Sequence, residues 1–251
     1  MLAEFAILAF LGGSLALDRG AGIGLMIHQP LVAACLAGSL LNPGPALELW
    51  ALRIPLGVGA LLQLLLTDAS LPAAQRPYES STAGAVGAAV AHFAMSRLHG
   101  EIAVPTGGLL WVVVGTLAGL LAALLGGPVM ALTRRHNRAD VPRIDSLAAE
   151  GRGGSIESLY WWSVTRVLLH GAVWTVVATA ALTGAALFLL PRLAARLSGD
   201  LIGFSFAGLL GAALVAAFLA HVQGRPSGLR WAAFGALAAL VARAWARGGS
   251  L

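Results

Sequence analysis

The sequence is poor in charge and nearly free of cysteine. Only 11% of its 251 residues are charged, whereas soluble globular domains carry about 25%. Its mean hydropathy is +0.83, and 58% of its residues are hydrophobic. These values exclude an ordinary soluble domain and predict an integral membrane protein. The single cysteine, Cys35, lies in an apolar run, which excludes a disulfide framework and a metal site built from several thiolates.

Lysine is absent, so all 16 basic residues are arginine. The isoelectric point of about 10.9 follows from the small number of acidic residues, 11, and does not by itself indicate a nucleic-acid-binding surface. The arginines stand in short connections beside apolar segments, where membrane orientation and anionic lipid headgroups explain them better than phosphate-backbone recognition. We therefore expect contact with a lipid bilayer and no binding of nucleic acid.

Long apolar segments occupy much of the sequence beyond residue 97. A helix needs about 20 mostly apolar residues to cross the hydrocarbon layer of a bilayer. The segments that reach or approach this length are residues 102–132, 160–190, 201–220 and 229–245. The sequence therefore predicts an all-α fold, with a polytopic transmembrane helical bundle over residues 97–251.

The first third of the chain, residues 1–96, is fragmented instead. His28 and Pro30 interrupt one apolar segment, and Arg53 and Pro55 interrupt the next. Lipid tolerates charges and unpaired backbone groups only where they face protein or a water-filled cavity, so these interruptions predict broken or re-entrant helices. We expect this region to hold the path of a polar solute. A second membrane subunit or another copy of the chain is expected to shield it, which predicts an oligomeric complex.

The sequence predicts that residues 133–158 form a soluble loop. It contains five arginines, so the positive-inside rule predicts that it lies in the cytoplasm. Tyr160, Trp161 and Trp162 follow directly, and amphipathic rings favour the membrane surface. The chain is therefore expected to re-enter the bilayer at these residues.

A few polar residues within the apolar first third are candidates to bind a solute. They are Asp18, His28, Gln63, Asp68 and Glu79. Their side chains can donate or accept hydrogen bonds, and broken helices add unpaired N–H and C=O groups, so together they suit a hydroxyl-rich solute such as a sugar. Structural interpretations stand beside this one. Gln63 is also suited to a hydrogen bond between helices, Asp18 to a polar pair with His28 or to the end of the first helix, and Asp68 and Glu79 to a solvated loop.

The sequence offers no catalytic constellation. It has no glycine-rich phosphate loop followed by lysine, no metal-ligating triad and no nucleophile with an adjacent base. We therefore expect no catalytic residue, no metal site and no cofactor in this chain.

Two stretches of the first third resemble a known family. Residues 11–44 read LGGSLALDRGAGIGLMIHQPLVAACLAGSLLNPG, and residues 57–91 read GVGALLQLLLTDASLPAAQRPYESSTAGAVGAAVA. Their early aspartate, the basic residue before Pro-Leu-Val, the Gly-x-x-Leu-Gln segment and the later proline-acid segment are similar to the IIC membrane subunit of mannose/fructose/sorbose-type sugar phosphotransferase systems. Residues 151–164, GRGGSIESLYWWSV, are similar to the end of that family's charged cytoplasmic loop.

The resemblance implies a sugar-translocating membrane subunit, the IIC component of a phosphoenolpyruvate-dependent sugar phosphotransferase system. It implies a multi-pass protein of the bacterial cytoplasmic (inner) membrane that transports a hexose-like sugar. In that family the IIC subunit usually pairs with a IID membrane subunit. Cytoplasmic IIA and IIB phosphocarrier proteins relay phosphate to the sugar, so the phosphoryl chemistry would lie outside this chain.

The sequence also departs from the family pattern at three places. Asn42 begins an Asn-Pro-Gly-Pro run where the family commonly has a Gly-Asp turn, Gln63 replaces a frequent glutamate, and Pro77-Tyr78-Glu79 replaces a Pro-Asp pair. These departures motivate an alternative function, a non-transporting membrane scaffold or regulatory relic of the same family.

Overall fold

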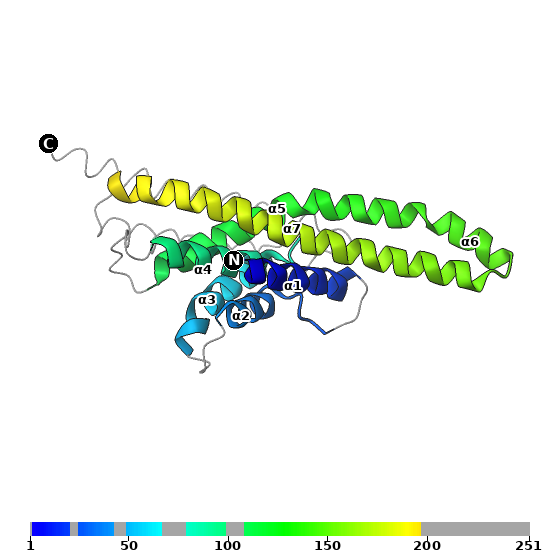
Figure 1. Ribbon diagram of the computed structural model, residues 1–251, viewed down its shortest axis with the longest axis horizontal. Helices are drawn as coiled ribbons and strands as arrows, with labels where there is room; N and C mark the ends of the chain where they lie inside the picture. Colours follow the sequence, from blue (N-terminus) through cyan, green and yellow to red (C-terminus); the bar gives the residue numbers. More distant parts are fainter. Residues whose placement is uncertain (1, 21–24, 43–48, 67–78, 99–107, 197–251) are drawn as a thin grey trace, which may run out of the picture.

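The computed structural model describes residues 2–20, 25–42, 49–66, 79–98 and 108–196, and their regular secondary structure is entirely helical. Figure 1 shows the seven helices of this described part: α1 (Leu2–Gly20), α2 (Pro30–Leu41), α3 (Leu49–Leu66), α4 (Ala83–Leu98), α5 (Leu109–Ala139), α6 (Val141–Ala149) and α7 (Gly153–Arg196). The predicted all-α fold class is confirmed for these residues.

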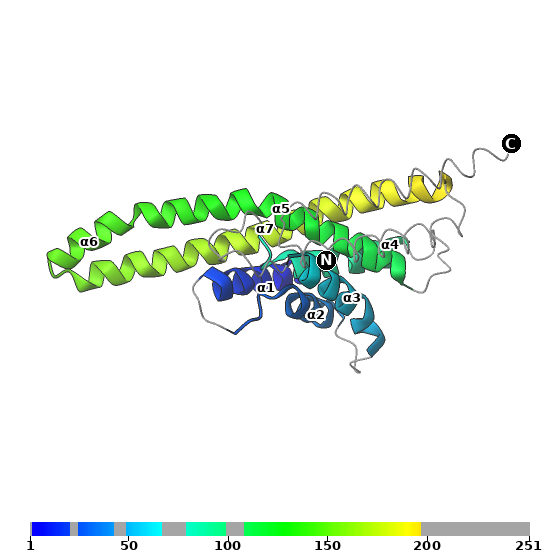
Figure 2. The same cartoon turned by 180° about the vertical axis from the view of Figure 1, so that it is seen from behind.

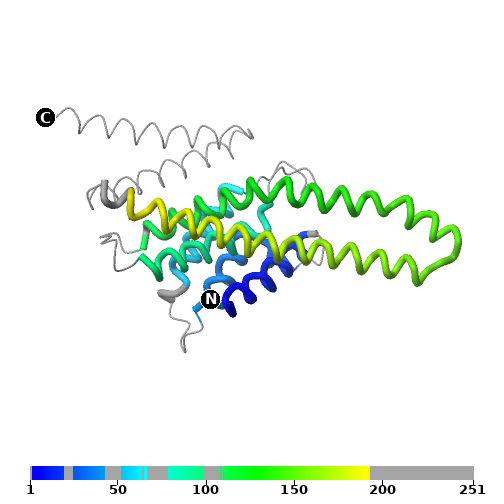
Figure 3. Tube along the Cα trace, turned by 45° about the horizontal axis from the view of Figure 1, so that its top comes forward, coloured from blue at the N-terminus to red at the C-terminus, as the bar shows by residue number. Residues whose placement is uncertain are grey.

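The helices form a bundle from which a long hairpin extends. Helices α1 to α4 gather on one side of α5 and α7, and the hairpin made by α5, α6 and α7 continues well beyond them (Figures 1 and 2). In Figure 3, α5 and α7 run side by side into this hairpin, with α6 near its tip. We call the part of the hairpin that extends beyond the bundle the arm; it consists of the end of α5, the whole of α6 and the start of α7.

Helix α4 is the centre of the bundle, in contact with α2, α3, α5 and α7. Its sequence is rich in alanine and glycine, and its residues are buried without interruption from Ala83 to Ala91. In a membrane, no hydrophobic effect drives helices together, and small side chains favour their association because they let the backbones approach closely. A Cβ at Gly87 would stand 2.5 Å from the carbonyl oxygen of Gly115 on α5, so the two backbones are in contact there.

A break in the helical run at His28 and Pro30 is confirmed. Helix α2 begins at Pro30, whose fixed φ and missing N–H suit the first helical position. The preceding residue, Gln29, is extended, with φ −65° and ψ 134°, and Met26 adopts the left-handed region with φ 57°. The chain therefore turns sharply before it enters α2.

The predicted interruption around Arg53 and Pro55 is wrong. Helix α3 runs through both residues. Pro55 removes one backbone hydrogen bond early in the helix, but its ring packs against Gly38 of α2, where a side chain would collide with it. Tight packing between α2 and α3 therefore offsets the local cost of the proline.

The predicted loop over residues 133–158 is also wrong as to its conformation. Helix α5 continues to Ala139, α6 follows almost at once, and α7 begins at Gly153. A turn separates α6 from α7, with Gly151 at φ 70°. The segment contains five arginines and three alanines, which are good helix formers, so it extends the apolar helices instead of ending them.

Two helical segments are long and apolar enough to cross a membrane by length and composition, Leu110–Ala149 and Gly153–Arg192. Many large apolar side chains on them are exposed: Leu117, Leu121, Leu124, Leu125, Leu168, Leu169, Val173, Val177, Phe188 and Leu189. Exposed apolar faces of this length favour contact with lipid. The predicted segments 201–220 and 229–245 lie outside the described residues.

Candidate functional site

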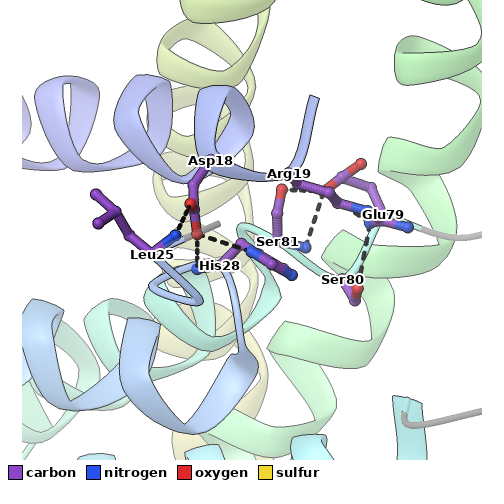
Figure 4. A network of polar contacts seen from close by, with 7 residues as sticks. All are labelled: Asp18, Arg19, Leu25, His28, Glu79, Ser80 and Ser81. Carbon is purple, nitrogen blue, oxygen red and sulfur yellow. Dashed lines mark hydrogen bonds and ion pairs between the residues drawn. The ribbon is translucent and has the colours of Figure 1, made fainter. Parts of the chain in front are cut away.

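Two acidic side chains are buried where α1 ends and where α2 and α4 begin (Figure 4). Asp18, in the last turn of α1, is 2% exposed, and Glu79, just before α4, is 1% exposed. A buried carboxylate is costly unless it is paired and hydrogen-bonded. Both carboxylates are held by such partners.

Asp18 binds the turn that leads into α2. Its Oδ1 accepts a hydrogen bond from the backbone N–H of Leu25 at 2.8 Å, and its Oδ2 accepts one from the backbone N–H of His28 at 3.1 Å. The Nδ1 of His28 lies 2.8 Å from the same Oδ2. The expected polar pair of Asp18 with His28 is therefore present, and Asp18 fixes the turn as well as ending the helix.

Glu79 pairs with the residue that follows Asp18. The Nη1 of Arg19 donates to Glu79 Oε1 and to the hydroxyl oxygen of Ser80, each at 3.1 Å. The same Oε1 accepts hydrogen bonds from the backbone N–H of Ser81, at 2.8 Å, and from the Ser81 hydroxyl. The backbone N–H of Glu79 donates to the carbonyl of Ala123 on α5 at 2.8 Å. The interpretation of Glu79 as a solvated loop residue is wrong.

The N-termini of two helices meet beside these carboxylates. A side chain at Gly84, in the first turn of α4, would collide with the carbonyl of Pro30, the first residue of α2. Helix N-termini carry a partial positive charge and unpaired N–H groups, which stabilise anions nearby. Asp18 and Glu79 each accept backbone N–H bonds just before such a terminus, so the helix ends help to hold both negative charges.

Several polar atoms at this site have unused hydrogen-bonding capacity. Among the described residues, the buried atoms Glu79 Oε2, Arg19 Nη2, Thr82 Oγ1 and Trp174 Nε1 have no hydrogen-bond partner. Buried polar groups in folded proteins are nearly always paired, so such atoms call for a partner that the described residues do not supply. The set contains one acceptor, two donors and one hydroxyl, and a hydroxyl group can satisfy both kinds.

The structure brings together three of the five predicted site residues. Asp18, His28 and Glu79 belong to this network, whereas Gln63 lies on α3 and accepts from the backbone N–H of Leu31 at 3.5 Å. That contact corresponds to the alternative interpretation of Gln63 as a link between helices. Asp68 lies outside the described residues.

Three further members of the network, Arg19, Ser80 and Ser81, were not predicted. The neighbouring sequence could have indicated them. Arg19 adjoins Asp18, and Ser-Ser-Thr directly before an alanine-rich run is typical of a helix N-terminus. Trp174 gave no signal, because a tryptophan in an apolar segment is ordinarily a packing residue.

The described residues contain no group of three or more His, Cys, Asp or Glu side chains able to hold a metal ion. The site is therefore built from two acid–base pairs, two helix N-termini and a set of unused donors and acceptors. No protein-family model, no curated protein and no solved structure matches the chain.

Proposed function

We propose that this chain is a membrane protein that translocates a hydroxyl-rich solute, a hexose-like sugar, through the polar site formed by Asp18, His28, Arg19 and Glu79. Its role would be that of the IIC subunit in a phosphotransferase system of the bacterial cytoplasmic membrane. The sequence resemblance over residues 11–91 supports the family, and the polar site supports the transport of a solute.

The observation that carries the proposal is the burial of two carboxylates at helix ends, each paired with a basic side chain. Ionisable residues within a membrane are costly and typically mark a solute or ion path. Transporters commonly bind their solutes where helices are interrupted, with helix N-termini pointing at the site. Here the end of α1 and the starts of α2 and α4 meet around Asp18 and Glu79.

The proposed division of labour follows from the chemistry that the chain lacks. Its described residues hold no metal-ligating cluster, and its sequence has no phosphate-binding loop. Phosphorylation of the sugar would therefore belong to cytoplasmic IIA and IIB proteins. A IID subunit or another copy of the chain would shield the first third of the chain, residues 1–96, from lipid.

Uptake measurements test this function directly. Vesicles containing the chain with its IID, IIA and IIB partners should take up a radiolabelled hexose. Glu79→Gln and Asp18→Asn should each lower uptake at least about tenfold, because each weakens a charge-assisted pair at the site. Glu157→Gln, at an exposed position on α7, is the matched control and should transport normally. Normal uptake by both site variants would refute the proposed path.

A specific observation favours the second candidate, a non-transporting scaffold. Both oxygens of Asp18 are already bonded within the chain, as expected of a group that only fixes a turn. A scaffold would show no uptake of any hexose with all partners present, while Asp18→Asn would still lower its thermal stability. The uptake assay therefore separates the two functions, and the melting curve shows that Asp18 fixes the turn in either case.

A further inference from the structure

Trp174 lies against Glu79 across a glycine of α5. A Cβ at Gly126 would stand 2.7 Å from Nε1 of Trp174 and 3.0 Å from the Cβ of Glu79. The absence of a side chain at Gly126 thus allows the indole of α7 and the base of the Glu79 side chain to approach α5 at the same point. Trp174 brings α7 to the site, in addition to α1, α2, α4 and α5.

The polar edge of this indole is buried but unused. An indole N–H can only donate, and Trp174 Nε1 has no acceptor among the described residues. Glu79 Oε2 can accept a hydrogen bond but has no donor among the described residues. Arg19 Nη2 can donate one but has no acceptor among them. A group that both accepts and donates, such as a hydroxyl, would satisfy these donors and this acceptor together.

We propose that Trp174 is a specificity-determining residue for the solute. One solute hydroxyl accepts a hydrogen bond from the indole N–H and donates its own proton to Glu79 Oε2, and a neighbouring hydroxyl accepts from Arg19 Nη2. Two adjacent hydroxyls match this set, so the ligand class is a neutral solute with vicinal hydroxyls. This inference rests on the proposed transport function and adds to it a residue from α7.

Glu79 is 1% exposed, so the structure shows its carboxylate closed off from solvent. The solute must displace side chains to reach Oε2, and the indole, which meets the Glu79 side chain at its Cβ beside Gly126, is a neighbouring group that can move. Binding is therefore expected to change the surroundings of the Trp174 N–H, which gives a direct measurement on the unaltered protein.

The test uses the full chain in lipid nanodiscs, with mannose, fructose and sorbose as probes. Trp174→Phe keeps an aromatic ring but removes the N–H, and it should raise the Kd of the best-bound probe about tenfold, the effect of one lost hydrogen bond. Trp161→Phe, at an exposed position on the same helix, should leave the Kd unchanged.

Nuclear magnetic resonance of the ¹⁵N-tryptophan-labelled wild type gives a second readout. The indole signal that disappears in Trp174→Phe should shift when the probe sugar binds. An unchanged Kd in Trp174→Phe, or an indole signal that does not move while sugar binds, would overturn the inference and leave the proposed function standing. A wild type that binds none of the probes would refute both. A shift that small diols reproduce without competing with sugar would mean that the N–H meets only water or adventitious solutes, and this too would overturn the inference.

Discussion

The carbonyl oxygen of Pro30 occupies the place where a side chain of Gly84 would begin. This contact joins the first turn of α2 to the first turn of α4, and it brings the two helix N-termini beside Asp18 and Glu79. The geometry of the polar site therefore depends on a residue that carries no polar side chain.

Gly84→Ala should destabilise the protein by about 1 to 3 kcal/mol, because the added methyl group meets backbone that cannot rotate away. Thermal unfolding in detergent measures this as a lower midpoint. Gly184→Ala is the matched control, since nothing lies within 4 Å of a Cβ at that position of α7. Alanine favours a helix over glycine, so the control should unfold at the same or a slightly higher temperature. Equal midpoints for the two variants would contradict the contact.

The Arg19–Glu79 pair should matter far more to stability than the exposed ion pair of Arg152 with Glu150. Its side chains are 7% and 1% exposed, whereas those of Arg152 and Glu150, 3.5 Å apart, are 60% and 56% exposed. Glu79→Ala strands a buried guanidinium and should cost about 3 to 5 kcal/mol. Arg152→Ala should cost at most about 1 kcal/mol, because water screens an exposed pair. Similar losses in both variants would mean that Glu79 is not buried as described.

Asp18 and His28 should be energetically coupled. Asp18→Ala removes the acceptor of two backbone N–H groups and of the imidazole, so we expect a loss of about 2 to 4 kcal/mol. In a double-mutant cycle with His28→Ala, the interaction energy should be about 0.5 to 3 kcal/mol. Asp145→Ala, at an exposed position on α6, should be neutral. Strictly additive losses would show that the 2.8 Å contact contributes nothing.

The sequence predicted the helical class and the break before α2 because both depend on local chemistry. Apolar length predicts helices in a membrane-like composition, and a proline at the first helical position marks a helix start. The pairing of Asp18 with His28 was foreseeable for the same reason, since the two residues are only ten positions apart and His28 lies in the turn before α2. Even so, the sequence could not show that this turn is closed by backbone N–H bonds to the carboxylate.

The two errors had different physical causes, tertiary packing at Pro55 and strong helix propensity in residues 133–158. Pro55 ordinarily ends a helix, but its contact with Gly38 of α2 keeps it within α3. Charge in residues 133–158 predicted a loop, but strong helix formers carry α5 and α7 outward. Trp174 could not be predicted at all, because its role depends on a glycine of α5 and a carboxylate before α4.

The two long helices of the arm should be held together by Arg166 of α7. Its Nη1 lies 2.7 Å from Asp140 Oδ2 and 3.4 Å from Asn137 Oδ1, and its guanidinium lies 5.5 Å from the ring centroid of Trp162. These contacts join the end of α5 to α7 at the point where α6 begins. Arg166→Gln removes the charge and the fork of donors, so the α5–α6 junction should exchange its amide hydrogens faster. Hydrogen exchange with mass spectrometry measures this, and α4 in the same protein should be unchanged. Arg143→Gln on α6, an exposed position, is the control. If exchange at the junction is as slow in Arg166→Gln as in the control, the arm is held by packing alone and not by this network.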